Sequence, residues 1–226
     1  MNNKYLGVLA VIFLCINNIC FAQEISINDI ISKIKSIDSV YYESTETPAF
    51  GTLSGWDSLA HGKTWFKTGY LRKEIYYSAN DRKLVKVFTP EDAYIYNSVS
   101  DKTEKWDPIP NILNLLSDFQ LNALEKGVSC KILGTDRINN EPVTVIEYVQ
   151  DFDRAGAQWP NDMTMENIKV KSWISNEKGV PLKQEIQWQK IQWPTHKWQD
   201  HTYTQIIEYK NYNFEAIPDE VFAVLK

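Results

Sequence analysis

The sequence predicts a mainly β protein with two helical segments, its strands following one another in an antiparallel meander. About eleven segments show the two-residue alternation of strands, and turn residues such as Pro90-Glu91 separate them. Only two segments space their apolar residues as a helix does. The chain shows no internal repeat or low-complexity tract, so a repeat architecture is not expected.

The candidate strands are short and evenly spaced, which favours a meander. They are residues 39–47, 62–78 (one long strand or a pair broken near Gly69), 83–89, 92–98, 102–106, 129–135, 141–150, 168–175, 181–189, 202–213 and 220–224.

The hairpin 168–188 has one apolar face and one charged face. Asn176 to Gly179 supplies its turn, and Gly179 can take a positive φ. The apolar face carries Ile168, Val170, Ser172, Ile174, Leu182, Gln184, Ile186 and Trp188. This face either packs on the core or lines a space for a ligand.

Both helical segments have recognisable ends. Residues 26–38 place five isoleucines in one stripe, with Ser26 or Asn28 as the N-cap. The second helix is expected over residues 111–125, where leucines widen the apolar face, and Gly127 follows its end.

The amino terminus has the layout of a secretory signal. Lys4 precedes an apolar run from Leu6 to Ile16, and the small residue Ala22 offers a cleavage site. Lipidation at Cys20 is disfavoured because Ile19 stands where such signals prefer a small residue. We therefore expect a cleaved signal peptide over residues 1–22, a single domain over 23–226, and a periplasmic location.

Charge and cysteine usage narrow the possible partners. The formal net charge is −5 and no basic stripe occurs, so a nucleic-acid partner is not expected. Cys130 is the one cysteine after the signal segment, so no internal disulfide can form. We expect it to be a buried core thiol, and an exported chain without disulfides fits a bacterial envelope protein.

Catalytic and metal-binding motifs are missing from the sequence. It contains no activated-serine, phosphate-binding-loop, paired-cysteine or zinc-protease motif. His196, Asp200 and His201 are close in sequence, but their spacing matches no usual metal-ligand pattern. We therefore predict no catalytic residue, no metal and no cofactor, and favour a binding protein over an enzyme.

Two long connections, residues 151–166 and 190–201, each contain the tripeptide Gln-Trp-Pro. A meander would bring Trp159, Trp193 and Trp198 to one rim of the sheet. There they would either form an aromatic lip at a cavity mouth or membrane edge, or pack their own loops down.

The order of these parts resembles the LolA-like family, the periplasmic outer-membrane lipoprotein carriers and relatives such as LolB and RseB-type amino-terminal domains. Three stretches are similar to family segments: GYLRKE (69–74), VKSWISNEKGVPLKQE (170–185) and IIEYKNYNFEAIPDEVF (206–222). Together the similar pieces run through nearly the whole chain after the signal segment.

The resemblance implies an incomplete antiparallel β-barrel, a half-barrel of about eleven strands with an N-terminal helix and a lid helix. Its apolar interior would receive the acyl chain of a lipoprotein or lipid. The implied lining residues are Phe66, Leu116, Phe119, Ile168, Val170, Ile174, Leu182, Ile186 and Trp188. Arg72 matches the arginine that contacts the lid in the carrier, although Lys73 follows it where the carrier has an aromatic residue.

On this basis we expect a non-enzymatic, monomeric carrier, possible partners being inner- or outer-membrane proteins. The alternative is an envelope stress-sensing or assembly factor that binds a protein partner through the same sheet. A hydrolase acting on envelope lipids is the third hypothesis.

Overall fold

The computed structural model describes residues 25–47, 59–79, 81–107, 113–126, 129–150, 164–192 and 202–223, without the side chains of residues 150, 164–167, 188–192 and 202–203. The predicted signal segment lies outside the described residues, as do Trp159, Trp193, Trp198, His196, Asp200 and His201.

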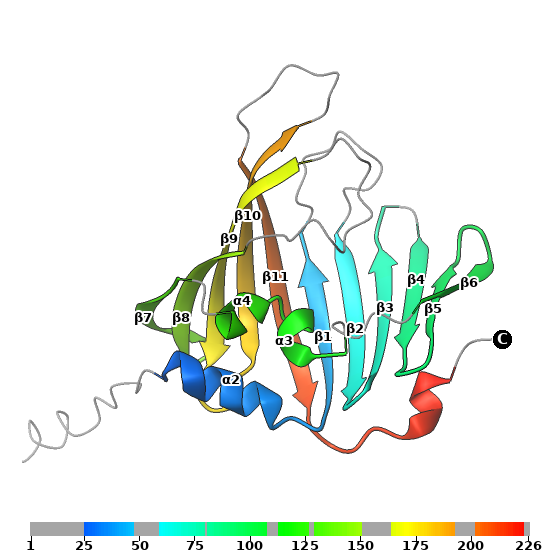
Figure 1. Ribbon diagram of the computed structural model, residues 1–226, viewed down its shortest axis with the longest axis horizontal. Helices are drawn as coiled ribbons and strands as arrows, with labels where there is room; N and C mark the ends of the chain where they lie inside the picture. Colours follow the sequence, from blue (N-terminus) through cyan, green and yellow to red (C-terminus); the bar gives the residue numbers. More distant parts are fainter. Residues whose placement is uncertain are drawn as a thin grey trace, which may run out of the picture.

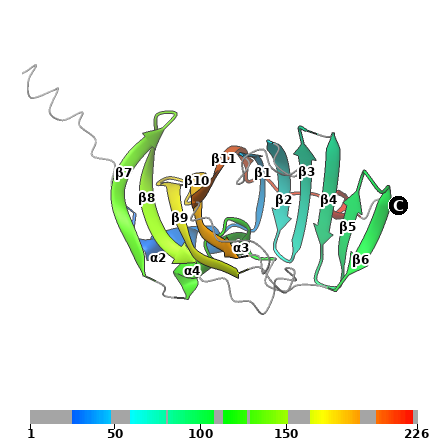
Figure 2. The ribbon, with the colours of Figure 1, turned by 90° about the horizontal axis from the view of Figure 1, so that it is seen from above.

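One antiparallel sheet of 11 strands organises the chain (Figures 1 and 2). Its strands are β1 (Ser39–Glu46), β2 (Ala60–Lys67), β3 (Tyr70–Tyr77), β4 (Arg82–Phe88), β5 (Ala93–Asn97), β6 (Lys102–Trp106), β7 (Cys130–Ile138), β8 (Glu141–Gln150), β9 (Thr164–Ser175), β10 (Pro181–Gln192) and β11 (Thr202–Asn213). Their order in the sheet is β6-β5-β4-β3-β2-β1-β11-β10-β9-β8-β7.

This order consists of two meanders, β1 to β6 and β7 to β11, joined where β1 pairs with β11. The edge strands β6 and β7 stand at opposite ends of the curved sheet, so the barrel is not closed (Figure 2). The predicted fold class, an incomplete antiparallel barrel of about eleven strands, is confirmed.

Gly69 and Pro218 explain the outcome of two strand predictions, those for residues 62–78 and 220–224. The segment 62–78 is a pair of strands, β2 and β3, because Gly69 takes a φ of +83° at the turn between them. The predicted strand 220–224 is wrong, since a 3-10 helix, η2 (Asp219–Phe222), occupies that place. Pro218 cannot donate a ladder hydrogen bond, and its carbonyl instead accepts from the Val221 N–H at 3.2 Å.

The first helix, α2 (Ile27–Lys35), begins as expected at Ser26, which forms a capping box with Asp29. Ile30 and Ile34 are buried against the sheet. The Lys33 ammonium donates to the carbonyls of Asn176 and Glu177, at 2.5 and 3.1 Å, which attaches α2 to the turn between β9 and β10.

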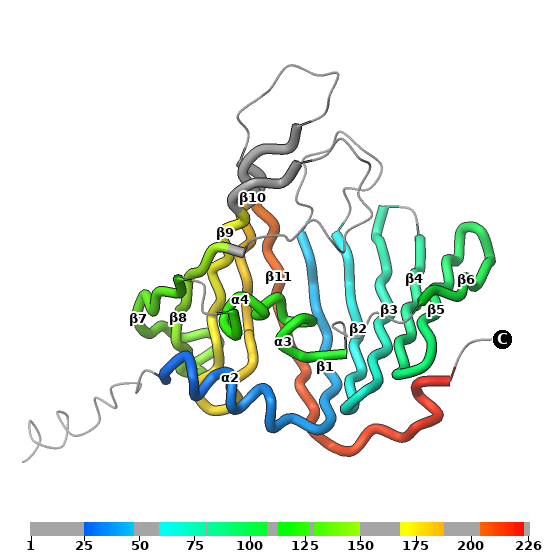
Figure 3. The backbone as a smooth tube through the Cα atoms, viewed as in Figure 1, coloured from blue at the N-terminus to red at the C-terminus, as the bar shows by residue number. Residues whose placement is uncertain are grey.

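The second helical segment is not one helix but two short ones, α3 (Leu115–Asp118) and α4 (Asn122–Glu125). Both lie against the concave face of the sheet, since Figure 3 shows α3 and α4 in front of its middle strands and Figure 2 shows them on the inner side of its curve. The break falls at Gln120, which has a φ of +57°. The Gln184 amide and the Tyr148 hydroxyl of the sheet donate hydrogen bonds to the carbonyls of Phe119 and Gln120. These two carbonyls therefore bond to the sheet and not to N–H groups of a following helical turn.

No helix in the described part of the chain is long and apolar enough to cross a membrane. The same described residues contain no group of three or more histidine, cysteine, aspartate or glutamate side chains that could hold a metal ion.

Candidate functional site

The concave face of the sheet is covered by residues 113–126, which contain α3 and α4 and are called the cover below. Five large apolar side chains of the cover are at most 6% exposed: Leu115, Leu116, Phe119, Leu121 and Leu124. They belong to one buried cluster that also includes residues of the sheet and of α2.

Seven of the predicted lining residues lie in this cluster: Phe66, Leu116, Phe119, Ile168, Val170, Ile174 and Ile186. They come from β2, β9, β10 and the cover, and none is more than 5% exposed. In the described conformation the cover therefore fills the concave face with its own side chains.

Leu182 is placed differently from the expectation. It packs in a second, smaller cluster with Val143, Val145 and Trp173. The pairing of β10 with β9 shifts register between Pro181 and Lys183, and such a shift breaks the two-residue alternation. Trp188 lies in β10, but its side chain is outside the described residues.

A buried glutamine connects the sheet to the cover. The Gln184 amide donates to the Phe119 carbonyl at 2.5 Å and to the Ser172 hydroxyl at 2.9 Å. The Tyr209 hydroxyl donates to the Gln184 side-chain oxygen at 2.7 Å, so both ends of the amide are bonded. The Tyr148 hydroxyl donates to the Gln120 carbonyl. These bonds fix the segment between α3 and α4 over β8 to β11.

An ion pair connects the cover to the other half of the sheet. Lys73 of β3 contacts an oxygen, Oδ1, of Asp118 at the end of α3. The Asp118 side chain is only 3% exposed, and its other oxygen, Oδ2, has no hydrogen-bond partner among the described residues. A buried, half-satisfied carboxylate is costly, so this contact is the least satisfied point of the cover.

A pocket of about 60 Å³ lies beside this ion pair, between the cover and strands β1, β2, β3 and β11. Two small residues on the concave face of β2, Gly62 and Thr64, contribute to its wall. Its lining residues are Tyr42, Ser44, Glu46, Gly62, Thr64, Lys73, Glu74, Ile75, Asp118, Gln120, Ile207 and Tyr209. The pocket thus includes charged and polar groups among its lining, in contrast to the apolar cluster next to it.

Burial works against the charges of four groups on this face, namely Asp118, Lys73, Glu46 and Lys86. It raises the pKa of Asp118 to about 8 and lowers the pKa of Lys73 to about 8, although the negative charge of Glu46 partly opposes the latter shift. Burial also raises the pKa of Glu46 and lowers that of Lys86. The charged forms persist there only to the extent that these four groups neutralise one another.

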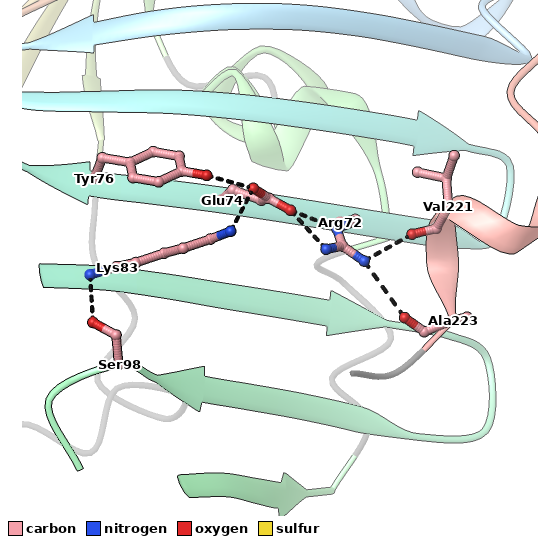
Figure 4. Close-up of polar contacts among 7 residues, drawn as sticks. All are labelled: Arg72, Glu74, Tyr76, Lys83, Ser98, Val221 and Ala223. Atoms are coloured by element: carbon pink, nitrogen blue, oxygen red, sulfur yellow. Dashed lines mark hydrogen bonds and ion pairs between the residues drawn. The ribbon is translucent and has the colours of Figure 1, made fainter. Parts of the chain in front are cut away.

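Arg72 faces away from the cover. Because side chains alternate along β3, Lys73 is on the concave face and Arg72 on the opposite one. The Arg72 guanidinium donates to Glu74 at 2.6 Å and to the carbonyls of Val221 and Ala223 at 3.0 and 3.4 Å (Figure 4). The contact with the cover that was expected of Arg72 is made by its neighbour, Lys73.

The sequence reading missed Lys73, Asp118, Glu46 and Gln184 as residues of the site. The sequence carried a signal for Lys73 and Gln184, because each is a polar residue on the otherwise apolar face of its strand. No sequence signal paired Lys73 with Asp118, which are far apart in the chain and meet only when the cover folds onto the sheet.

Comparisons with known proteins bear on the fold. No protein-family model matches the sequence, and no curated protein matches it either. An uncharacterized conserved protein from Thermus thermophilus is similar in structure with a TM-score of 0.51 at 8% identity, over 86% of this chain and 91% of that one. At such low identity the likeness concerns the fold alone.

Two further solved structures match at lower TM-scores. The lipoprotein LppX of Mycobacterium tuberculosis has a TM-score of 0.47 at 12% identity, over 85% of this chain and 96% of that one. A LolA superfamily protein from Nitrosomonas europaea has a TM-score of 0.39 at 12% identity, over 88% of this chain and 98% of that one. With its unclosed antiparallel sheet and helices against the concave face, the chain has the fold of an incomplete antiparallel barrel, which it shares with the Thermus protein.

Proposed function

We propose that this chain is a periplasmic, non-enzymatic carrier that binds the acyl chain of a lipoprotein or lipid beneath its cover. The observation that supports this most directly is the make-up of the cover. Its two helices have four residues each, and together with the residues between them they carry five large buried apolar side chains. Helices this short are unstable alone in water, so their packing on the sheet maintains them.

An acyl chain offers the concave face the same kind of contact that the cover offers. Each methylene group removed from water contributes about 0.8 kcal/mol, so a long chain can replace the leucine and phenylalanine contacts of the cover. The cover would move aside when a chain enters and return when it leaves. A binding space that closes on itself also keeps a large apolar surface from water when empty.

Bound lipid and a matched pair of variants test the proposal. Protein purified from an envelope fraction should carry acyl chains that mass spectrometry detects, and should bind a fluorescent fatty acid. Val170→Ala removes two methyl groups from the concave cluster, and Val143→Ala removes them from the second cluster; both valines are 0% exposed. Val170→Ala should weaken fatty-acid binding about fivefold, as expected for lost apolar contact.

Val143→Ala is the control, because it lowers stability through a similar cavity without touching the concave face. It should leave the fatty-acid affinity unchanged. Equal effects of the two variants, or the absence of any acyl chain and of any fatty-acid binding, would contradict a carrier role. Recovery of one stoichiometric protein partner without lipid would favour the alternative of a partner-binding envelope factor.

A further inference from the structure

The charged groups of the concave face are arranged in rows across the strands. Lys73 of β3 pairs directly with Lys86 of β4, and Tyr77 pairs with Arg82 in the same two strands. Like charges placed directly opposite each other destabilise a sheet unless an anion lies between them. On this face Glu46 supplies one carboxylate, and it acts on both lysines.

The second carboxylate does not come from the sheet. Asp118 belongs to the cover, and it reaches Lys73 from above. If the cover moves away, Asp118 leaves with it, and Glu46 is then the one described carboxylate on this face that acts on Lys73 and Lys86. The open concave face would therefore lack one negative charge that the closed one has.

Asp118 is also poorly satisfied in its closed position. Its Oδ2 has no hydrogen-bond partner in the described part of the chain, although the side chain is only 3% exposed. Lys73 keeps 28% of its side-chain surface exposed and lines the 60 Å³ pocket. The pocket has room for a few water-sized groups even before Asp118 withdraws.

We infer that Lys73 binds the anionic head group of an amphiphilic ligand, and that Asp118 occupies this position when the ligand is absent. The ligand would then be a long-chain anion, with its carboxylate or phosphate at Lys73 and its chain in the adjoining apolar cluster. Head group and Asp118 compete for one ammonium, so binding of the head group releases the cover. This inference rests on the proposed function and specifies its substrate class.

Four probes separate head-group recognition from chain binding: palmitate, uncharged palmitoyl glycerol, cationic hexadecylamine, and acetate or inorganic phosphate without a chain. Each is titrated below its critical micelle concentration against the mature protein and its variants. Palmitate should bind about tenfold more tightly than palmitoyl glycerol, as a typical coupling between charged groups gives. The short anions should bind far more weakly than palmitate.

The variants assign that preference to residues. Lys73→Met should abolish the tenfold ratio while palmitoyl glycerol still binds, and Lys73→Arg should retain the ratio, which shows that charge and not folding is responsible. Asp118→Asn should raise the ratio about fivefold, because it removes the competing carboxylate at nearly constant size. Lys131→Met, a change at an exposed lysine of β7, should leave the ratio unchanged.

Each contrary outcome has a distinct meaning. Equal binding of palmitate and palmitoyl glycerol, a preference for hexadecylamine, or an unchanged ratio in Lys73→Met overturns the inference but leaves a carrier of apolar chains. Binding of acetate or phosphate as tightly as palmitate also overturns it, since the site would then take free anions. Failure of every amphiphile to bind contradicts the proposed function itself.

Discussion

The two faces of β3 satisfy their charges in different ways. On the convex face, Glu74 accepts hydrogen bonds from Arg72, from the Tyr76 hydroxyl at 2.8 Å, and from Lys83 at 3.0 Å (Figure 4). On the concave face, Lys73 meets a carboxylate that belongs to the cover and is bonded through one oxygen only. One network is complete within fixed elements, and the other depends on a segment of two short helices.

The pKa values of the carboxyl groups express this difference. Burial alone would raise the pKa of Glu74, but its hydrogen bonds with Arg72, Tyr76 and Lys83 outweigh burial and lower the pKa to about 2. Burial raises the pKa of Asp118 to about 8. A lowered pKa means that the fold stabilises the charged carboxylate, which indicates a permanent structural contact. A raised pKa means that the fold disfavours the charged form, which indicates a contact that can be exchanged.

The largest effect is expected from Arg72→Met. This change leaves the Glu74 carboxylate, whose side chain is 11% exposed, without its bidentate donor and removes two hydrogen bonds to the end of η2. We expect the free energy of unfolding, measured by denaturant titration, to fall by about 3 kcal/mol. Amide exchange near Val221 should also accelerate.

Lys67→Met is a matched control, because the exposed Lys67 pairs with Asp219 of the same 3-10 helix. Exposed ion pairs contribute little, so this variant should unfold almost as the parent does. If Arg72→Met were equally mild, the convex network would not be the stable contact that its geometry indicates.

Glu74→Gln tests the same network through pH. The folded-state pKa of Glu74 lies below its ordinary value of 4.5. Its stabilisation is therefore present above about pH 4.5 and is lost as the pH falls toward 2. We expect the parent to lose about 1–2 kcal/mol across this window, after allowance for solvent screening, through this group alone. Glu74→Gln should remove that part of the acid dependence, and an unchanged profile would show that other groups cause it.

Gly62→Ala tests the space on the concave face. A Cβ atom at position 62 would lie 2.3 Å from the Ser44 Oγ, so the serine would have to move. The free energy of unfolding should fall by about 1–2 kcal/mol, as for overpacking. The double variant with Ser44→Ala should recover most of this loss, because the Ser44 Cβ is 3.6 Å away and needs no shift. Additive losses in the double variant would argue against a close approach at this point.

Apart from the Lys67→Met control, the smallest effect on stability is expected from Asp118→Asn. The change removes a charge that burial disfavours, while Lys73 keeps Glu46 as a partner and 28% of its side-chain surface exposed. The free energy of unfolding should change by no more than about 1 kcal/mol in either direction. A loss as large as that of Arg72→Met would mean that both faces of β3 carry permanent contacts.

Most of the fold could be predicted from the sequence, because local patterns control it. Alternation along β2, β3 and β9, the turn at Gly69, and the isoleucine stripe and capping box of α2 each depend on neighbours within a few residues. Prediction failed where long-range contacts replaced local ones. The helix expected over 111–125 breaks at Gln120. There the Tyr148 hydroxyl and the Gln184 amide donate hydrogen bonds to the carbonyls of Gln120 and Phe119, in place of the N–H groups of a continuing helix.

The sequence by itself determined that strands alternate, where they turn, and that an apolar face would exist on 168–186. Tertiary structure alone decided that Lys73, not Arg72, contacts the cover, that a register shift moves Leu182 to another cluster, and that small residues of β2 help to line a pocket with charged and polar groups. The physical reason is the separation along the chain of the residues that interact. Periodicity follows from backbone geometry within one strand, whereas the meeting of Lys73 and Asp118 requires the cover to fold back onto the sheet.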